Sequence, residues 1–253
     1  MRLTSIRALV TRPTEQAESL ALAIREHEGY AGILPMLAIE PLAETQAMRD
    51  TILSLDLYDK VIVTSHHAAR YGLDRLENYW PQLPLHLEWF AIGKKTAHTL
   101  NTFDVSPQSP EHSANSEGLL ALDSLSEVDG QRILIIKGEG GLTLLEDTLT
   151  ELGASVSTLA VYRRQRPEYP EHTLANQLKN EAINTVLCAS GETFSNFMAL
   201  AGATPLSAYD LVVPSERVAE LAYNTPFRQV IIARGAGNDA MLSALETLEL
   251  QKK

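Results

Sequence analysis

The chain contains the same strand–turn–helix pattern twice, and this repeat constrains its fold more than any other feature. The apolar run "RALVT" begins at Arg7 and "RILIIKG" begins at Arg132, 125 residues later, and each is followed by leucines or isoleucines at helical spacing. At the same spacing of 125 residues, Ser65 in "VIVTSHHAA" falls on Ser190 in "TVLCASGET". Because apolar runs that alternate with amphipathic stretches are typical of β-α units, the pattern predicts parallel sheets flanked by helices.

A spacing of 122 residues continues the repeat in the later part of each copy. Gly93 in "WFAIGKKTAHTL" falls on Ser215 in "LVVPSERVAEL", and Ser116 in "NSEGLLALDSL" falls on Asn238 in "GNDAMLSALETL". A duplicated α/β chain is expected to form two similar domains with a crevice between them.

Two extended, proline-containing runs follow the first unit of each copy. They are "ILPMLAIEPL" and "TLAVYRRQRP". If these runs cross between the two domains side by side as a hinge, the first unit of each copy belongs to the domain formed by the other copy.

The composition limits the classes of partner. The chain has 253 residues, of which 45% are hydrophobic, and a net charge of −11. We therefore expect a globular protein that binds neither nucleic acid nor an anionic membrane, and any anionic ligand would need a locally basic pocket. The start of the sequence has no signal-peptide pattern, no run is apolar enough to cross a bilayer, and the single cysteine, Cys188, lies in an apolar run. These features predict a cytoplasmic protein with a buried, reduced thiol.

The turns after the predicted strands carry mostly small polar or basic residues. In a parallel sheet such turns share one edge, where ligands meet backbone amides and helix amino termini. The turn residues are Thr11, Arg12, Thr64, Ser65, Gly93, Lys94, Lys137 to Gly141, Ser190, Gly191, Pro214, Ser215 and Arg234 to Asn238. Each Ser or Thr also suits a helix N-cap, so the set as a whole indicates a binding edge, whereas no single member does.

Four common site patterns are missing from the sequence. The segments "KGEGG" and "RGAGND" match neither the dinucleotide motif nor the phosphate-loop motif. His66 and His67 are adjacent and have no Cys or His at metal-ligand spacing, and Ser65 lacks the G-x-S-x-G of a nucleophile elbow. We therefore expect neither a metal site nor hydrolase chemistry.

Tyr162 stands at the end of a β-rich run and is followed by Arg163, Arg164 and Arg166. The ring of a tyrosine at such a position can pack in the core while its hydroxyl reaches solvent at the edge of the sheet. A tyrosine in a cleft can also act as a proton donor. The local sequence leaves both roles open.

Taken in order and spacing, several of these segments resemble the uroporphyrinogen-III synthase family. The segments are "LVTRP", "VIVTSHHAA", "AIGKKTAHTL", "SANSEGLLALDSL", "RILIIKGEGG" with "AVYRR", and "VVPSERVAELA". The resemblance implies two α/β domains, each a parallel sheet flanked by helices, joined by a two-stranded linker, with the amino-terminal unit packed in the domain of the carboxyl-terminal half. We accordingly expect one domain over 1–35 and 170–253, a second over 43–158, and linker strands over 36–42 and 159–169.

The resemblance also implies a reaction. Members of the family close the linear tetrapyrrole hydroxymethylbilane with inversion of its ring D, through azafulvene and spiro intermediates, to give uroporphyrinogen III and water. No metal or organic cofactor takes part. The chain is thus expected to be a monomeric, cyclising lyase of haem biosynthesis, and the enzyme that produces hydroxymethylbilane is a candidate partner.

Site residues follow from the same resemblance. Tyr162 becomes the candidate proton donor for loss of water, and turn residues hold the substrate's acetate and propionate groups, largely through backbone amides; these are Thr11, Arg12, Ser65, Ser190 and Ser215. Because the substrate is a polycarboxylate, we add basic residues near the turns as binding candidates: Lys94, Lys137, Arg163 and Arg217. The turn "TSHH" departs from the "TS-x-N" of many relatives.

Two other classes of protein fit parts of the pattern. A hinged-cleft protein that binds a small molecule without catalysis also has duplicated α/β domains and crossing linkers, and binding without conversion would favour it. A nucleotide-dependent transferase would use the glycine-rich turns, and the absence of thermal stabilisation by any nucleotide would exclude that class.

Overall fold

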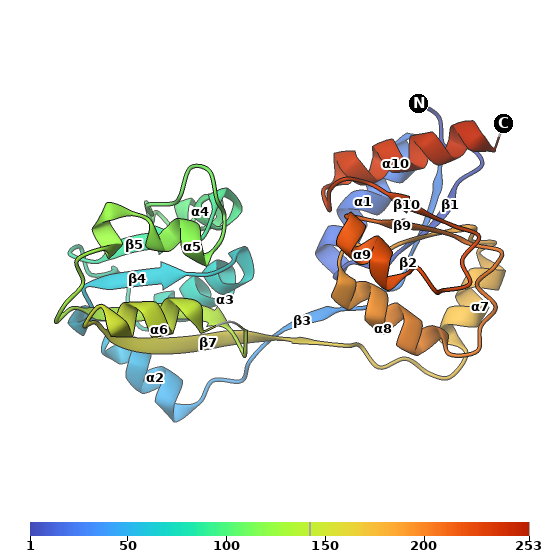
Figure 1. Ribbon diagram of the computed structural model, residues 1–253. Helices are drawn as coiled ribbons and strands as arrows, with labels where there is room; N and C mark the ends of the chain where they lie inside the picture. The colour runs from blue at the N-terminus through green and yellow to red at the C-terminus, as the bar shows by residue number, and fades with distance from the viewer. Residues whose placement is uncertain (142, 253) are drawn as a thin grey trace. The chain divides into compact units, whose positions relative to one another are not determined.

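The computed structural model describes residues 1–141 and 143–252. They form two compact units: unit 1 is Met1–Ala38 with Gln165–Lys253, and unit 2 is Ile39–Arg164. Figure 1 shows a sheet with helices in each unit.

The sheet of unit 1 has the strand order β10-β9-β8-β1-β2, and all of its neighbouring strands run parallel. Its strands are β1 (Arg7–Val10), β2 (Tyr30–Ile33), β8 (Thr185–Leu187), β9 (Asp210–Val213) and β10 (Gln229–Ile232). The helices of this unit are α1 (Thr14–Glu26), α7 (Thr173–Asn180), α8 (Gly191–Ala201), α9 (Glu216–Leu221) and α10 (Asn238–Gln251).

Alternation along the strands gives the unit 1 sheet two apolar faces. Ala8 and Val10 of β1 pack with buried residues of α1 and α10, whereas Leu9 packs with residues of α7, α8 and α9. Successive side chains of a strand point to opposite faces. Strands that are buried on both sides read as continuous apolar runs, which is why "RALVT" shows no alternation in the sequence.

The sheet of unit 2 has the strand order β3-β7-β6-β4-β5, and β7, β6, β4 and β5 run parallel. Its strands are β3 (Ala38–Pro41), β4 (Lys60–Val63), β5 (Glu88–Ala91), β6 (Arg132–Gly138) and β7 (Ser155–Gln165). Its α-helices are α2 (Gln46–Leu53), α3 (His66–Glu77), α4 (Lys94–Asn101), α5 (Ser116–Leu120) and α6 (Leu144–Glu151), with 3-10 turns η1 (Leu55–Leu57) and η2 (Asp123–Leu125).

The unit 2 sheet is also buried on both faces. Val61 and Val63 of β4 pack with buried residues of α2, α3 and α4, whereas Ile62 packs with residues of α5 and α6. Gly153 follows α6 with a φ of +91°, a conformation that glycine adopts without strain. Gly153 thus lies directly after the C-cap residue of α6, a position where glycine commonly ends a helix.

The strand orders show the sequence repeat in space. The order β9-β8-β1-β2 in unit 1 matches the order β5-β4-β6-β7 in unit 2, and β1 and β6 begin at the aligned residues Arg7 and Arg132. The counterpart of β10 is reduced to one parallel bridge between Phe90 and Gln108. Since β1 lies between β2 and β8, the amino-terminal unit shares a sheet with the carboxyl-terminal half. The predicted fold class is therefore confirmed.

The first proline-containing run contains β3 and the second contains β7 from Thr158 onward, and these strands are neighbours in the unit 2 sheet. The amide of Leu42, just after β3, donates a hydrogen bond of 3.1 Å to the carbonyl oxygen of Val161 in β7. The unit boundaries fall at the first residue of β3 and the last residue of β7. The predicted linker boundaries, 36–42 and 159–169, stay a prediction.

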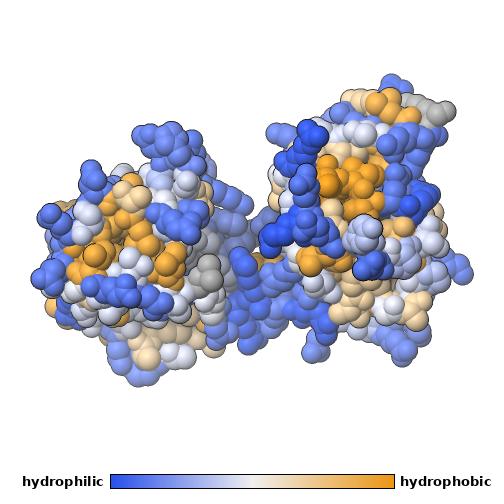
Figure 2. Space-filling model, viewed as in Figure 1, coloured by the Kyte–Doolittle hydropathy of each residue, from blue (hydrophilic) through white to orange (hydrophobic). Residues whose placement is uncertain are grey.

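Most apolar side chains lie in these cores. Cys188 is fully buried, as predicted, and burial raises the pKa of its thiol to about 12. Figure 2 shows hydrophilic residues over much of the face in view, with apolar patches on both units. Scattered exposed leucines such as Leu22 and Leu85 are ordinary for folded domains. Within the described residues, no helix is both long enough and apolar enough to span a membrane.

Candidate functional site

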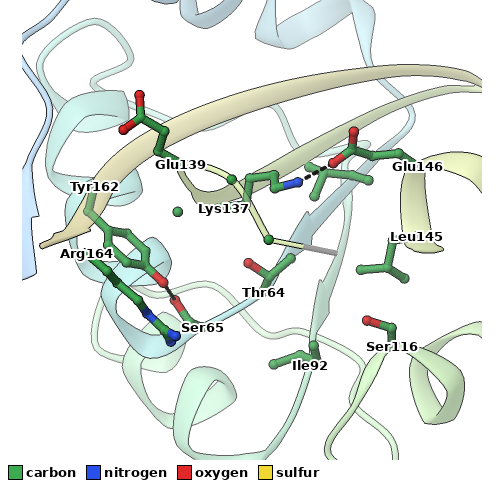
Figure 3. Close-up of a pocket in the computed structure, with 14 residues that line it drawn as sticks. Thr64, Ser65, Ile92, Ser116, Lys137, Glu139, Leu145, Glu146, Tyr162 and Arg164 are labelled. Atoms are coloured by element: carbon green, nitrogen blue, oxygen red, sulfur yellow. Dashed lines mark hydrogen bonds and ion pairs between the residues drawn. The ribbon is translucent and has the colours of Figure 1, made fainter. Parts of the chain in front are cut away.

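A pocket of about 420 Å³ opens at the carboxyl edge of the unit 2 sheet. It is lined by the residues that follow β4 and β5, by the carboxyl end of β6 and the turn after it, by side chains of β7, and by residues in the first turns of α5 and α6 (Figure 3). Lys137 and Gly138, which the sequence predicts in a turn, are the last two residues of β6. In parallel sheets this edge is the usual place for a ligand, because turns and helix amino termini meet there. The pocket contains three of the residues predicted to be catalytic or substrate-binding, which are Ser65, Lys137 and Tyr162, together with the predicted turn residues Thr64 and Gly138 to Gly141.

Tyr162 is packed along its ring and reaches the pocket with its hydroxyl group. The residue is 4% exposed and belongs to the core of unit 2. Its ring centroid lies 5.7 Å from that of His67 and 6.3 Å from that of Tyr71. The hydroxyl oxygen lies 3.1 Å from Oγ of Ser65, and either atom can be the donor (Figure 3). This position is compatible with both roles that the sequence leaves open.

Ser65 connects the tyrosine to the start of α3. Its Oγ accepts a hydrogen bond of 3.0 Å from the amide of Ala68, so Ser65 is the N-cap of this helix of 12 residues. The amino terminus of a helix carries partial positive charge and favours anions nearby. A carboxylate in the pocket would therefore lie close to a favourable helix terminus.

Four charged side chains line the same pocket. Lys137 and Arg164 are basic, whereas Glu139 and Glu146 are acidic. Nζ of Lys137 forms an ion pair with Oε1 of Glu146, which lies in the first turn of α6 (Figure 3). The positive charge that was predicted at Lys137 is thus already balanced by a neighbouring carboxylate.

The other predicted residues of unit 2 lie elsewhere. Arg163 is exposed, and its guanidinium pairs with Glu40 at 3.2 Å. Lys94 is exposed at the first position of α4. Neither residue is among the described residues that line the pocket.

In unit 1, three predicted turn residues lie at one edge of the sheet. Thr11, Ser190 and Ser215 follow β1, β8 and β9, which are consecutive strands. Oγ of Ser190 caps α8 by accepting a hydrogen bond of 3.1 Å from the amide of Thr193, and Ser215 is the N-cap residue of α9. The hydroxyl of Thr11 is buried and donates to the carbonyl oxygen of Leu187 at 2.7 Å. The structure therefore brings these residues to one edge, where the hydroxyls of Thr11 and Ser190 are used in local hydrogen bonds and the side chain of Ser215 makes no capping hydrogen bond.

The two predicted arginines of unit 1 differ in environment. Arg12 is 4% exposed; its Nη1 donates to Oδ1 of Asn238 and its Nη2 to the carbonyl oxygen of Ala236, both at 2.7 Å. Burial lowers the pKa of the Arg12 guanidinium. These bonds hold the loop before α10 against the end of β1. Arg217, by contrast, is exposed on α9.

Comparisons with known proteins cover both units. The family described as uroporphyrinogen-III synthase HemD matches residues 18–243. The chain belongs to the uroporphyrinogen-III synthase family. Among its relatives, the Salmonella typhimurium uroporphyrinogen-III synthase is 33% identical over 251 residues, or 94% of this chain and 99% of the relative. The Escherichia coli enzyme is 32% identical over 248 residues, again 94% of this chain and 99% of the relative.

Solved structures of the uroporphyrinogen-III synthase family share the fold. A mutant from Thermus thermophilus has a TM-score of 0.62 at 17% identity, covering 98% of this chain and 100% of the other. The Helicobacter pylori protein has a TM-score of 0.58 at 14% identity, with the same coverages of 98% and 100%.

Two charged side chains of the unit 2 pocket, Arg164 and Glu146, are not among the site residues predicted from the sequence. Arg164 lines the pocket beside Tyr162, and the period of two along a strand places residues 162 and 164 on one side, which is a signal that could have found it (Figure 3). Glu146 had no comparable signal, because its pairing with Lys137 depends on how α6 packs. Gly138 was noted only as part of a turn. Among residues 1–141 and 143–252, no three His, Cys, Asp or Glu side chains are grouped so as to hold a metal ion.

Proposed function

We propose that this protein closes hydroxymethylbilane with inversion of ring D and releases uroporphyrinogen III and water. The observation that carries the proposal is the family match over residues 18–243, which covers most of both units. Relatives with 33% and 32% identity over nearly their full length, both named uroporphyrinogen-III synthase, support it.

Tyr162 is the proposed proton donor. The substrate's terminal hydroxyl is a poor leaving group until a proton reaches it. The phenol of Tyr162 donates that proton, water leaves, and the electron-rich pyrrole becomes an azafulvene cation. The buried ring and the pocket-facing hydroxyl support this role, since the donor is held in place by packing. The phenolate later takes back the proton that the rearranged macrocycle loses.

Control of the closure is the other proposed task. Attack from the already substituted carbon of ring D gives a spiro intermediate, which fragments and recombines with the ring inverted. If the protein does not control the geometry of closure, the unsubstituted carbon of ring D reacts instead, and the symmetrical type I isomer forms. Binding that favours the spiro geometry over direct closure therefore determines the product.

Backbone amides at helix starts are the proposed anchors for the substrate's carboxylates. In unit 2 the anchor is the α3 terminus at Ser65, and in unit 1 the anchors are the turns at Thr11, Ser190 and Ser215. The basic candidates Arg12, Lys94, Lys137, Arg163 and Arg217 are further proposed ligands for the carboxylates, of which Lys137 and Arg163 would have to exchange their present partners, Glu146 and Glu40, for the substrate. Within unit 1, the bonds from Arg12 to Ala236 and Asn238 support a role in shaping its edge.

The test is a product assay. Purified protein is incubated with hydroxymethylbilane, the products are oxidised to porphyrins, and the type I and type III isomers are separated. A type III isomer that dominates and scales with protein concentration supports the proposal. Only type I isomer, at the rate of a heat-denatured sample, would refute it. Saturable binding of hydroxymethylbilane with that same outcome would favour the hinged-cleft binding protein instead.

We further propose that the enzyme is a cytoplasmic monomer that receives hydroxymethylbilane from the enzyme producing it. We also propose that one domain consists of residues 1–35 and 170–253, that the other consists of residues 43–158, and that residues 36–42 and 159–169 are the linker strands between them. Sedimentation velocity across a tenfold concentration range tests the monomer, because a rising sedimentation coefficient would contradict it. Limited proteolysis tests the linkers, which should be cut before the sheets.

A further inference from the structure

The residue beside Tyr162 in the neighbouring strand is Gly138, and it is there because β7 carries an irregularity. Along β6 and β7 the register is regular up to the pair Lys137 and Ala160, but Gly138 pairs with Tyr162. Val161 is therefore the extra residue of a β-bulge. Bulges occur beside active sites, where they redirect a side chain.

The bulge changes which side chains are buried. Successive residues of a regular strand point to opposite faces, yet Val161 and Tyr162 are both buried in the same core of unit 2. The irregularity thus allows Tyr162 to occupy the core face while its hydroxyl reaches Ser65.

The tyrosine ring occupies the space that a side chain at position 138 would need. A Cβ atom on Gly138 would lie 2.6 Å from Cζ, 2.8 Å from Cε2 and 2.9 Å from the hydroxyl oxygen of Tyr162. Ordinary contacts between carbon atoms are about 3.5–4.0 Å. The overlap is with the tip of the ring, which is the part that carries the proton.

The backbone around Tyr162 is held on both sides. Its carbonyl oxygen accepts a hydrogen bond of 2.7 Å from the amide of Glu139, and the carbonyl oxygen of Val161 accepts one of 3.1 Å from the amide of Leu42. A side chain at position 138 would therefore displace the tip of the tyrosine ring before it displaced the strand. That movement would break the contact between the hydroxyl and Ser65.

We propose that Gly138 is a positioning residue for Tyr162. Because Gly138 has no side chain, the phenol ring of Tyr162 can pack against the backbone of β6 at the bulge, and this contact fixes the hydroxyl in the pocket. The inference rests on the proposed role of Tyr162 as proton donor. It assigns to Gly138, a pocket-lining residue without a side chain, a function that is exerted through the tyrosine ring.

The first experiment compares two Gly→Ala variants in unit 2. Gly138→Ala is expected to lower kcat roughly 10- to 100-fold, since a misplacement of about 1 Å can cost 10²-fold, with KM changed less than about threefold. Gly72→Ala in α3 is the matched control, because its Cβ would lie 2.7 Å from Cγ2 of Ile136 and meet no tyrosine. It should lower the melting temperature but leave kcat per folded molecule near wild type. Unchanged kcat in Gly138→Ala would overturn the proposal.

The second experiment separates positioning from a general loss of structure. The Tyr162→Phe variant keeps the ring atoms Cζ and Cε2 but lacks the hydroxyl group that carries the proton. In that variant, Gly138→Ala should still lower the melting temperature, whereas kcat should fall no further than in Tyr162→Phe alone. A second, independent fall in kcat would show that Gly138 acts by another route and overturn the proposal.

Three further outcomes separate a failure of folding, a failure of the proposed proton donor and a failure of the inference alone. If the Gly138→Ala variant does not fold, the double variant Gly138→Ala, Tyr162→Ala should fold as well as Tyr162→Ala does, because the ring that overlaps the new Cβ is gone. A double variant that stays unfolded would contradict the proposed contact between position 138 and the tyrosine ring. If Tyr162→Phe itself keeps wild-type kcat, the proposed proton donor is wrong and this inference falls with it. Low kcat in Tyr162→Phe with normal kcat in Gly138→Ala overturns the inference alone.

Discussion

In the unit 2 pocket, the ammonium group of Lys137 is paired with the carboxylate of Glu146, and their side chains are only 15% and 26% exposed. The pair withholds positive charge from a substrate carboxylate. We expect Glu146→Gln to lower KM for hydroxymethylbilane roughly 3- to 10-fold, because such a coupling is worth about 1 kcal/mol and 1.4 kcal/mol corresponds to a tenfold change. Initial rates at several substrate concentrations give KM.

The matched control for this prediction is Asp147→Asn. Asp147 is the next residue of α6, accepts a hydrogen bond from Thr143, and is not among the described residues that line the pocket. Its substitution changes the net charge by the same amount. Equal KM values in the two variants would contradict a local effect of Lys137, and the difference between them should shrink as salt is added.

Ser65 should affect both stability and turnover. Ser65→Ala removes the N-cap of α3, at a cost of about 1 kcal/mol in the free energy of unfolding, and removes the hydroxyl beside Tyr162. Loss of one hydrogen bond worth about 1 kcal/mol predicts a roughly fivefold fall in kcat. Kinetics and urea unfolding measure the two effects.

Two variants separate the roles of Ser65. Thr45 is the N-cap of α2, and its Oγ1 accepts a hydrogen bond of 3.2 Å from the amide of Met48. Thr45→Ala removes this cap and should lower stability without lowering kcat. Ser65→Thr keeps a hydroxyl and should restore both properties. A kcat in Ser65→Ala that matches Thr45→Ala would show that Ser65 acts only as a cap.

The periodicity of the sequence predicted the fold. It could not predict which partners individual side chains bind, because those partners lie in distant segments of the chain. The two sheets follow from apolar runs such as "RALVT", because strands buried on both faces leave a strong signal. Tyr162 was found because it ends such a run. Arg12 and Asn238 are separated by 226 residues, so no local pattern shows that their side chains meet. The bulge at Val161 was equally hidden, since register is a property of two strands.

Arg12 is expected to act mainly on the stability of unit 1. Its guanidinium donates to Asn238 and to the carbonyl oxygens of Ala236 and Gly237. Lysine cannot reproduce this forked geometry, so Arg12→Lys should cost about 2 kcal/mol in the free energy of unfolding and lower the melting temperature by roughly 4–8 °C. Arg2→Lys is the control, because Arg2 is 76% exposed. Similar melting temperatures for the two variants would contradict the prediction.

Asp210 should make unit 1 sensitive to acid. The carboxylate is fully buried at the start of β9 and bonds to Arg228 and Gln229, with Lys252 at 3.2 Å. Burial raises the pKa of Asp210, but the hydrogen bonds from Arg228 and Gln229 and the charge of Lys252 outweigh it, so the pKa lies below its ordinary value. The folded protein therefore binds this proton more weakly than the unfolded chain does.

The stabilisation from Asp210 is fully present above the unfolded-state pKa, about 3.9, and is lost as the pH falls through the lower folded-state pKa. Asp210→Asn should lower the free energy of unfolding by about 2 kcal/mol at pH 7, because charged hydrogen bonds are lost, and the gap to wild type should close below about pH 4. Urea midpoints across this range measure it. Asp74→Asn, at an exposed position of α3, is the control and should show no such gap. A gap for Asp210→Asn that stays constant down to pH 2 would show that the carboxylate's charge is not the cause.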